Sequence, residues 1–99
     1  MGALVSTAKM VELGSMITGG QIRAARALLK WSGAELARKC GVSYPAIVRA
    51  EKADGIPRMI TSNLMTIRNV LEAAGVEFFD GNYSGDGGPG VRKTNNDTD

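Results

Sequence analysis

The chain has 99 residues, 43% of them hydrophobic and 22% charged, which is the composition of one small globular domain. It contains no histidine and one cysteine, which excludes a Ser-His-Asp triad, a Cys/His zinc site and an internal disulfide built from this chain alone. No apolar run reaches the roughly 18 residues of a membrane span, and the start lacks the pattern of a signal peptide. We therefore expect a cytoplasmic protein with no metal, cofactor or membrane partner. The sequence contains no acid–base pair or cofactor motif, so we do not expect an enzyme.

The charge is unevenly distributed. Residues 18–75 carry nine Lys or Arg and four Asp or Glu, a net charge of +5, whereas residues 76–99 carry two and five, a net charge of −3. A basic body suits a polyanionic partner. Solubility alone explains such a charge equally well.

The first 31 residues contain an arm and a helix. Residues 1–17 have only a weak helical pattern and are expected to be an N-terminal extension, either a docking helix or a frayed arm. The domain proper, residues 18–75, begins with Thr18 and Gln21 at the spacing of a capping box. The helix that follows ends at Trp31, and its predicted apolar face consists of Ile22, Ala25, Leu28 and Leu29.

Residues 32–55 predict two short helices joined by a tight turn. Ser32 and Glu35 have capping-box spacing at the start of the first. Gly41 suits the left-handed residue that closes it, and Ser43 can cap the second. The apolar stripes of the two helices consist of Leu36, Ala37, Cys40, Ile47 and Ala50.

One more helix follows this pair. Gly55 and Pro57 are expected to end the preceding helix, and Thr61 or Ser62 to cap the new one, which stops at Gly75. Its apolar face consists of Leu64, Ile67, Val70, Leu71 and Ala74.

Residues 76–94 predict short strands around a Gly-rich loop, and residues 95–99 a disordered tail. The first strand carries Val76, Phe78 and Phe79, which a two-stranded hairpin cannot cover by itself. Two solutions are open, namely docking on the chain's own helices and pairing with a second subunit. We favour the second, which makes a two-fold homodimer.

The pattern LAxxxGVSxxxIxxxE over residues 36–51 resembles the signature of the Cro and lambda-repressor-like (XRE-type) helix-turn-helix family. The resemblance runs from about residue 22 to 74. Together with the strand pattern of residues 76–94, it predicts a mainly α fold, a compact bundle of four to five short helices containing a helix-turn-helix, with a short C-terminal β-strand or hairpin. Domains of this family often begin close before the first helix, where Met16 stands, so residues 1–15 could be an extension ahead of the natural start. Many members carry Gln where this chain has Gly33, so the contact made by that Gln is in question here.

The resemblance also pairs Arg26 with Glu51 in a structural ion pair between helices. Both charges fall on or near apolar faces, where an unpaired charge is costly. A phosphate contact by Arg26 is the alternative.

In such a motif the second helix, residues 43–53, lies in the major groove of DNA. Tyr44, Pro45 and Arg49 are the candidates for base readout, since an Arg fork can donate to two acceptors of guanine. The candidates for backbone contacts are Ser43, Arg38, Lys39, Lys52 and Arg58. Other interpretations are that Ser43 is simply a helix cap, that Lys39 is a solvated lysine, and that Tyr44 packs on the neighbouring turn.

The sequence thus predicts a sequence-specific regulator of transcription, repressor-like, that binds double-stranded DNA as a homodimer and associates with the nucleoid when bound. The alternative is a protein-binding regulator of the same fold, such as an antitoxin or anti-activator, for which residues 76–80 would supply a docking surface.

Overall fold

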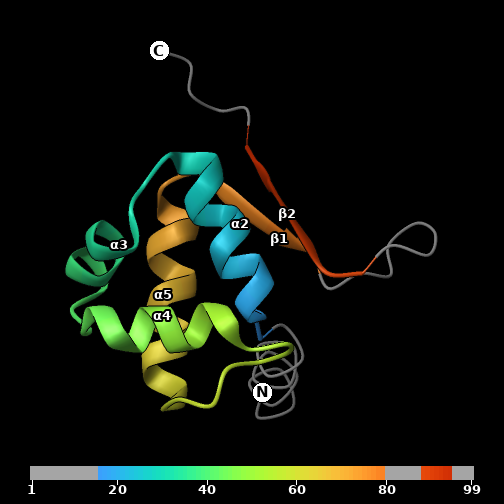
Figure 1. The fold of residues 1–99 in the computed structure, drawn as a ribbon. Coiled ribbons are helices and arrows are strands. Elements are labelled where there is room, and N and C mark those ends of the chain that lie inside the picture. The colour runs from blue at the N-terminus through green and yellow to red at the C-terminus, as the bar shows by residue number, and fades with distance from the viewer. Residues whose placement is uncertain (1–15, 80–87, 95–99) are drawn as a thin grey trace, which may run out of the picture.

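Four helices are followed by a two-stranded hairpin in the computed structural model, which describes residues 16–79 and 88–94 (Figure 1). The predicted mainly helical fold with a C-terminal hairpin is confirmed. The predictions for residues 1–15, most of the Gly-rich loop and the tail 95–99 fall outside the described residues. In chain order the elements are α2 (Gly19–Leu29), α3 (Gly33–Cys40), α4 (Tyr44–Lys52), α5 (Thr61–Ala73), β1 (Val76–Phe79) and β2 (Gly90–Lys93).

Side-chain caps start the first three of these helices. The capping box of α2 is present, since Thr18 Oγ1 accepts from Gln21 N at 3.1 Å and Gln21 Oε1 from Thr18 N at 2.9 Å. At α3 the Ser32 hydroxyl accepts from Glu35 N at 3.0 Å, and at α4 the Ser43 hydroxyl accepts from Ala46 N at 3.2 Å. These hydroxyls satisfy amides that have no partner inside the helix.

The start of α5 differs from the prediction. Its N-cap is Ile60, without a side-chain hydrogen bond, and Thr61 is already helical. Neither Thr61 nor Ser62 caps the helix, because the carbonyl of Ile60 accepts from Asn63 N and Leu64 N and so begins the helix before a hydroxyl is available.

The end of α2 also comes earlier than predicted. α2 stops at Leu29, and Lys30 takes the left-handed conformation with φ of 60°. Trp31 therefore lies beyond the helix, although Trp31 N still donates to Arg26 O at 3.0 Å. α4 ends at Lys52, and its caps Ser43 and Ala53 match the predicted range 43–53. Gly41 closes α3 at φ of 71°, as predicted.

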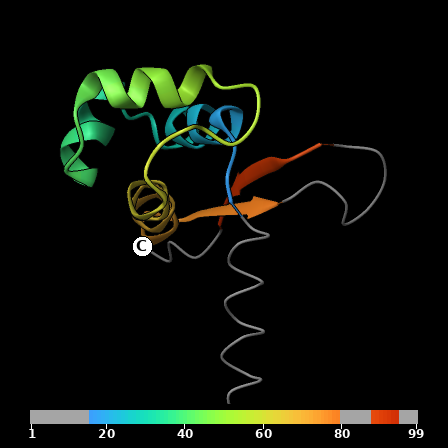
Figure 2. The same cartoon turned by 90° about the horizontal axis from the view of Figure 1, so that it is seen from below.

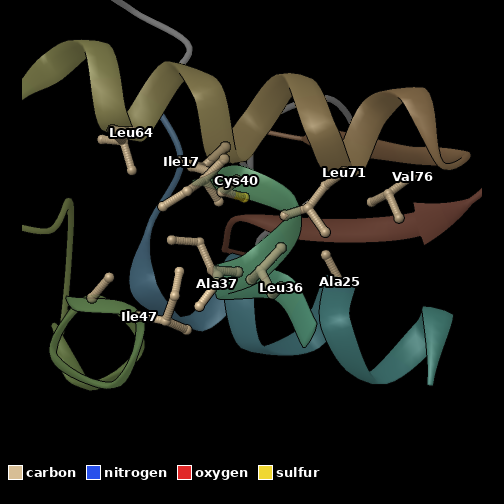
Figure 3. Packing of buried hydrophobic residues seen from close by; sticks show 12 residues of the cluster. Ile17, Ala25, Leu36, Ala37, Cys40, Ile47, Leu64, Leu71 and Val76 are labelled. Atoms are coloured by element: carbon tan, nitrogen blue, oxygen red, sulfur yellow. The ribbon is translucent and has the colours of Figure 1, made fainter. Parts of the chain in front are cut away.

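The core lies between α5 and the other helices. Figure 3 shows Leu64 and Leu71 pointing from α5 toward side chains of α2 and α3. Leu28 was predicted on the buried face of α2, but it is 39% exposed, whereas Ile22 and Ala25 of the same predicted face are fully buried. The buried hydrophobic residues are Ile17, Ile22, Ala25, Leu36, Ala37, Cys40, Ile47, Ala50, Leu64, Ile67, Leu71 and Val76.

The hairpin is antiparallel and packs on α2 and α5 of its own chain. Val76 is 2% exposed, and Phe78 and its cross-strand partner Val91 pack against the core. Gln21 joins the hairpin to α2, because its Nε2 donates to Phe79 O at 2.7 Å and to Gly90 O at 2.9 Å. Docking on the chain's own helices, one of the two predicted solutions, is therefore present. Strand pairing with a second subunit stays a prediction.

Figure 2 shows that α2 lies between α4 and the hairpin. The side of α4 that faces away from α2 is thus free of the hairpin, and this side carries the predicted interface.

Candidate nucleic-acid interface

A short turn fixes α4 relative to α3. Gly41 turns the chain, and Val42 N then donates to Ala37 O at 3.1 Å. The Val42 side chain packs against the core from within the turn. The turn therefore gives α4 a fixed direction with respect to α3, as a helix-turn-helix requires.

The side chains on the inner face of α4 are buried against the rest of the protein. Ile47 and Ala50 are 1% and 3% exposed, and Glu51 is 8% exposed. Arg26 donates from Nε to Glu51 Oε2 at 2.7 Å and from Nη2 to Oε1 at 2.9 Å, a two-bond ion pair of the kind that Arg forms best with a carboxylate. These hydrogen bonds raise the pKa of Arg26 above its ordinary value, although partial burial acts in the opposite sense.

Two further bonds surround this ion pair. Arg26 Nη1 donates to Trp31 O at 3.0 Å, which ties the chain beyond α2 to the same guanidinium. Arg23 donates to the carbonyl of Glu51 near the end of α4. The structure thus brings Arg26 and Glu51 together between α2 and α4. All three guanidinium nitrogens of Arg26 donate within the protein, which favours the structural ion pair over a phosphate contact.

The outer face of α4 is open. Tyr44, Pro45, Arg49 and Lys52 are all exposed, and Val48 is half-buried between them. Within residues 16–79 and 88–94, Arg49 forms no hydrogen bond or ion pair. Its guanidinium is therefore available to a ligand, in contrast to that of Arg26.

Tyr44 lies at the start of α4 and against the start of α3. A Cβ built on Gly33 would lie 3.0 Å from Cε1 and 3.7 Å from Cδ1 of the Tyr44 ring. The ring nonetheless remains 53% exposed. Packing on the neighbouring helix and exposure to a ligand, which the sequence presented as alternatives, thus occur together.

The residues predicted to contact the DNA backbone are all exposed, but they differ in their contacts within the protein. Arg38, Lys52 and Arg58 are exposed, on α3, on α4 and on the loop before α5. Lys39 is exposed too, but its Nζ lies 4.8 Å from the centre of the Trp31 ring, a cation–π contact that restrains it. The Ser43 hydroxyl accepts from Ala46 N, and its O–H can still donate to a phosphate oxygen.

Sequence reasoning missed a groove beside the C-terminal half of α4. It has a volume of about 790 Å³, and its lining includes Arg49, Arg58 and Asn63. Asn63 lies in the first turn of α5, half-buried, where no periodic pattern singles it out. The sequence signal that could have found the groove is the apolar, exposed pair Ile56 and Ile60 in the loop.

Other kinds of site find little support among the described residues. They contain no group of three or more His, Cys, Asp or Glu that could hold a metal ion. Burial raises the pKa of the Cys40 thiol to about 11, which disfavours the thiolate that a nucleophile requires. In the part of the chain that the structure describes, no helix has the length and apolar character needed to cross a membrane.

Comparison with protein-family models gives a match. A family model described as helix-turn-helix matches residues 22–65, which covers α3, the turn and α4 together with most of α2. No curated protein matches the chain.

Proposed function

Because residues 22–65 belong to the Cro and lambda-repressor-like (XRE-type) helix-turn-helix family, whose members are DNA-binding regulators, we propose that this protein recognises a specific sequence in double-stranded DNA and acts as a repressor. Helix α4 lies in the major groove, with its N-terminal residues at the base edges. The protein acts in the cytoplasm and associates with the nucleoid when bound.

The observation that carries this proposal is the division of α4 into two faces. The inner face is held by Ile47, Ala50 and the Arg26–Glu51 ion pair. The outer face carries the guanidinium of Arg49, which has no partner within residues 16–79 and 88–94. A rigid helix with an unengaged Arg on its exposed side suits bidentate donation to guanine O6 and N7.

The other residues of the interface have separate roles. Tyr44 and Pro45 contact a thymine methyl or the edge of a base next to the one that Arg49 reads. Contacts to phosphates hold the protein in register without reading sequence, and they come from Ser43, Arg38, Lys39, Lys52 and Arg58.

The protein binds as a homodimer to a two-fold operator. A two-fold axis presents two copies of α4 about 34 Å apart, which matches successive major grooves on one side of the duplex. The strand pair Val76–Phe79 and Gly90–Lys93 has edges at which a second copy can pair, and helix α5 is the alternative interface.

Selection of bound duplexes from a random pool, followed by titration of the selected site, tests the proposal. A repeated motif with two-fold symmetry, bound by two chains with an affinity that falls steeply as salt rises, is expected. Retention of random and selected duplexes with equal affinity would contradict sequence-specific recognition.

A second candidate is a protein-binding regulator of the same fold, such as an antitoxin or anti-activator. Ile56 and Ile60 favour it, because they are 54% and 68% exposed on one loop. Co-purification of a second protein that is released by Ile60→Asp, with no selected DNA motif, would support this candidate instead.

A further inference from the structure

Gly33 occupies the first position of α3, where glycine brings no conformational advantage. Its φ lies outside the left-handed region, so any L-residue can adopt its backbone conformation. A glycine inside a helix is less favourable than alanine. The backbone therefore gives no reason for a glycine at this position, and the reason lies in the surrounding space.

That space is occupied by Tyr44. The atoms nearest to a Cβ on Gly33 would be Tyr44 Cε1 at 3.0 Å, Cδ1 at 3.7 Å and Cζ at 4.0 Å, so one edge of the ring faces the glycine. A contact of 3.0 Å between carbons is too close, and the ring would have to move. The ring is thus held against α3 on one side and open to solvent on the other.

We infer that Gly33 is a positioning residue for DNA recognition. The space left by its missing side chain fixes the direction of the Tyr44 ring, so that α4 presents Tyr44 to the duplex already in its bound orientation. An aromatic side chain that is ordered before binding loses less entropy on binding. This inference rests on the proposed function, because Tyr44 must contact DNA for its orientation to matter.

The substitution Gly33→Ala tests the inference, with Gly20→Ala as the matched control. Gly20 also lies in a first helical turn, and a Cβ there would meet only Arg23 Nη2 and Thr18 Oγ1, both at 3.9 Å. Both variants gain helix propensity, so both should melt at or above the temperature of the original protein. Gly33→Ala should lower the ratio of affinities for selected and random duplexes about five- to tenfold, as loss of one base contact does, and Gly20→Ala should leave it unchanged.

A double substitution isolates the coupling. In a Tyr44→Ala background, Gly33→Ala should have no further effect on the affinity ratio, because the ring it displaces is gone. In the free protein, nuclear Overhauser effects should link the Gly33 Hα protons to the Tyr44 ring. Absence of those effects, or a loss caused by Gly33→Ala that persists without Tyr44, would overturn the inference.

The outcomes also separate the inference from the proposed function. If Arg49→Ala lowers the affinity ratio while Gly33→Ala leaves it intact, Gly33 has no positioning role and the proposed function stands. If the original protein shows no preference for any selected duplex, both fail.

Discussion

The two faces of α4 differ in whether their polar groups already form hydrogen bonds or ion pairs within the protein. On the inner face, Glu51 accepts two hydrogen bonds from Arg26 and is 8% exposed. On the outer face, Arg49 and Lys52 are exposed and have no partner within residues 16–79 and 88–94. The nine residues of α4 thus have two separate roles, since the inner face stabilises the fold and the outer face is free to bind a ligand. Substitutions on the two faces should therefore change different measured quantities.

The largest effect is expected on the inner face. Arg26→Met leaves the Glu51 carboxylate buried without its partner, which typically costs about 3–5 kcal/mol of the free energy of unfolding. The lower end of this range applies here, because the Arg26 side chain is 24% exposed and some of its interaction is screened by solvent. Thermal and denaturant unfolding measure the loss.

The double variant Arg26→Met, Glu51→Leu is the control. Removing both charges replaces an unpaired carboxylate by apolar contact, so part of the stability should return. Losses that simply add in this double-mutant cycle would mean that the two residues do not interact.

The outer face should respond in the opposite way. Arg49→Ala is expected to weaken binding to the selected site by roughly 1–3 kcal/mol and to relax preference at one base step. The melting temperature should hardly change, because Arg49 is exposed and unpaired among the described residues. Titration with selected and random duplexes measures the difference. Equal losses on both would make Arg49 a backbone contact.

A smaller effect distinguishes two lysines. Lys39→Ala and Lys52→Ala should each weaken binding to all sequences alike and reduce the salt slope by about 1. Only Lys39→Ala should also lower stability, by about 0.5–1 kcal/mol or less, because only Lys39 stacks on Trp31. Unfolding curves of the two variants, compared directly, check this, and equal stabilities would show that the stacking contributes nothing.

The effect of Cys40 is confined to alkaline pH and is negligible at neutral pH. Its pKa is raised by burial to about 11 from an ordinary value of 9.0, so the folded chain holds the thiol proton more tightly than the unfolded chain does. This contribution to stability is complete below about pH 9 and is lost as the pH rises toward 11. The melting temperature should therefore fall less over this range in Cys40→Ala than in the original protein. Iodoacetamide at pH 8 should label Cys40 slowly until denaturant is added, and fast labelling of the folded chain would contradict its burial.

The elements predicted best are those that local chemistry specifies. Thr18 and Gln21 bond to each other across three residues, and Gly41 takes the left-handed conformation that its position suggests. The period of apolar residues likewise placed Ile47 and Leu64 in the core. Each of these depends on neighbours within one or two turns of the chain, and a single sequence contains that information.

The features that were missed depend on contacts between distant residues. Leu28 fits the helical period, but no element covers its position, and it stays 39% exposed. The cation–π contact of Lys39 with Trp31 and the contact of the Tyr44 ring edge with Gly33 can be predicted only when the direction of α3 relative to its neighbours is known. At the interface, the sequence therefore named Tyr44 correctly as an exposed residue of α4 without revealing what holds its ring.

The two hydrogen bonds donated by the Gln21 side chain can form only late in the synthesis of the chain. Its amide donates to carbonyls that lie 58 and 69 residues further along. A chain leaving the ribosome thus has the first turn of α2 long before it has both acceptors of that amide, and the second hydrogen bond cannot form until Gly90 has emerged. A shortened chain that ends after Gly75 lacks both acceptors and the buried Val76, so it loses these two hydrogen bonds and part of the core. The hairpin is in this sense the last part of the helical domain to be synthesised, and a subunit interface on it is better probed by point substitutions at its edges than by cutting it away.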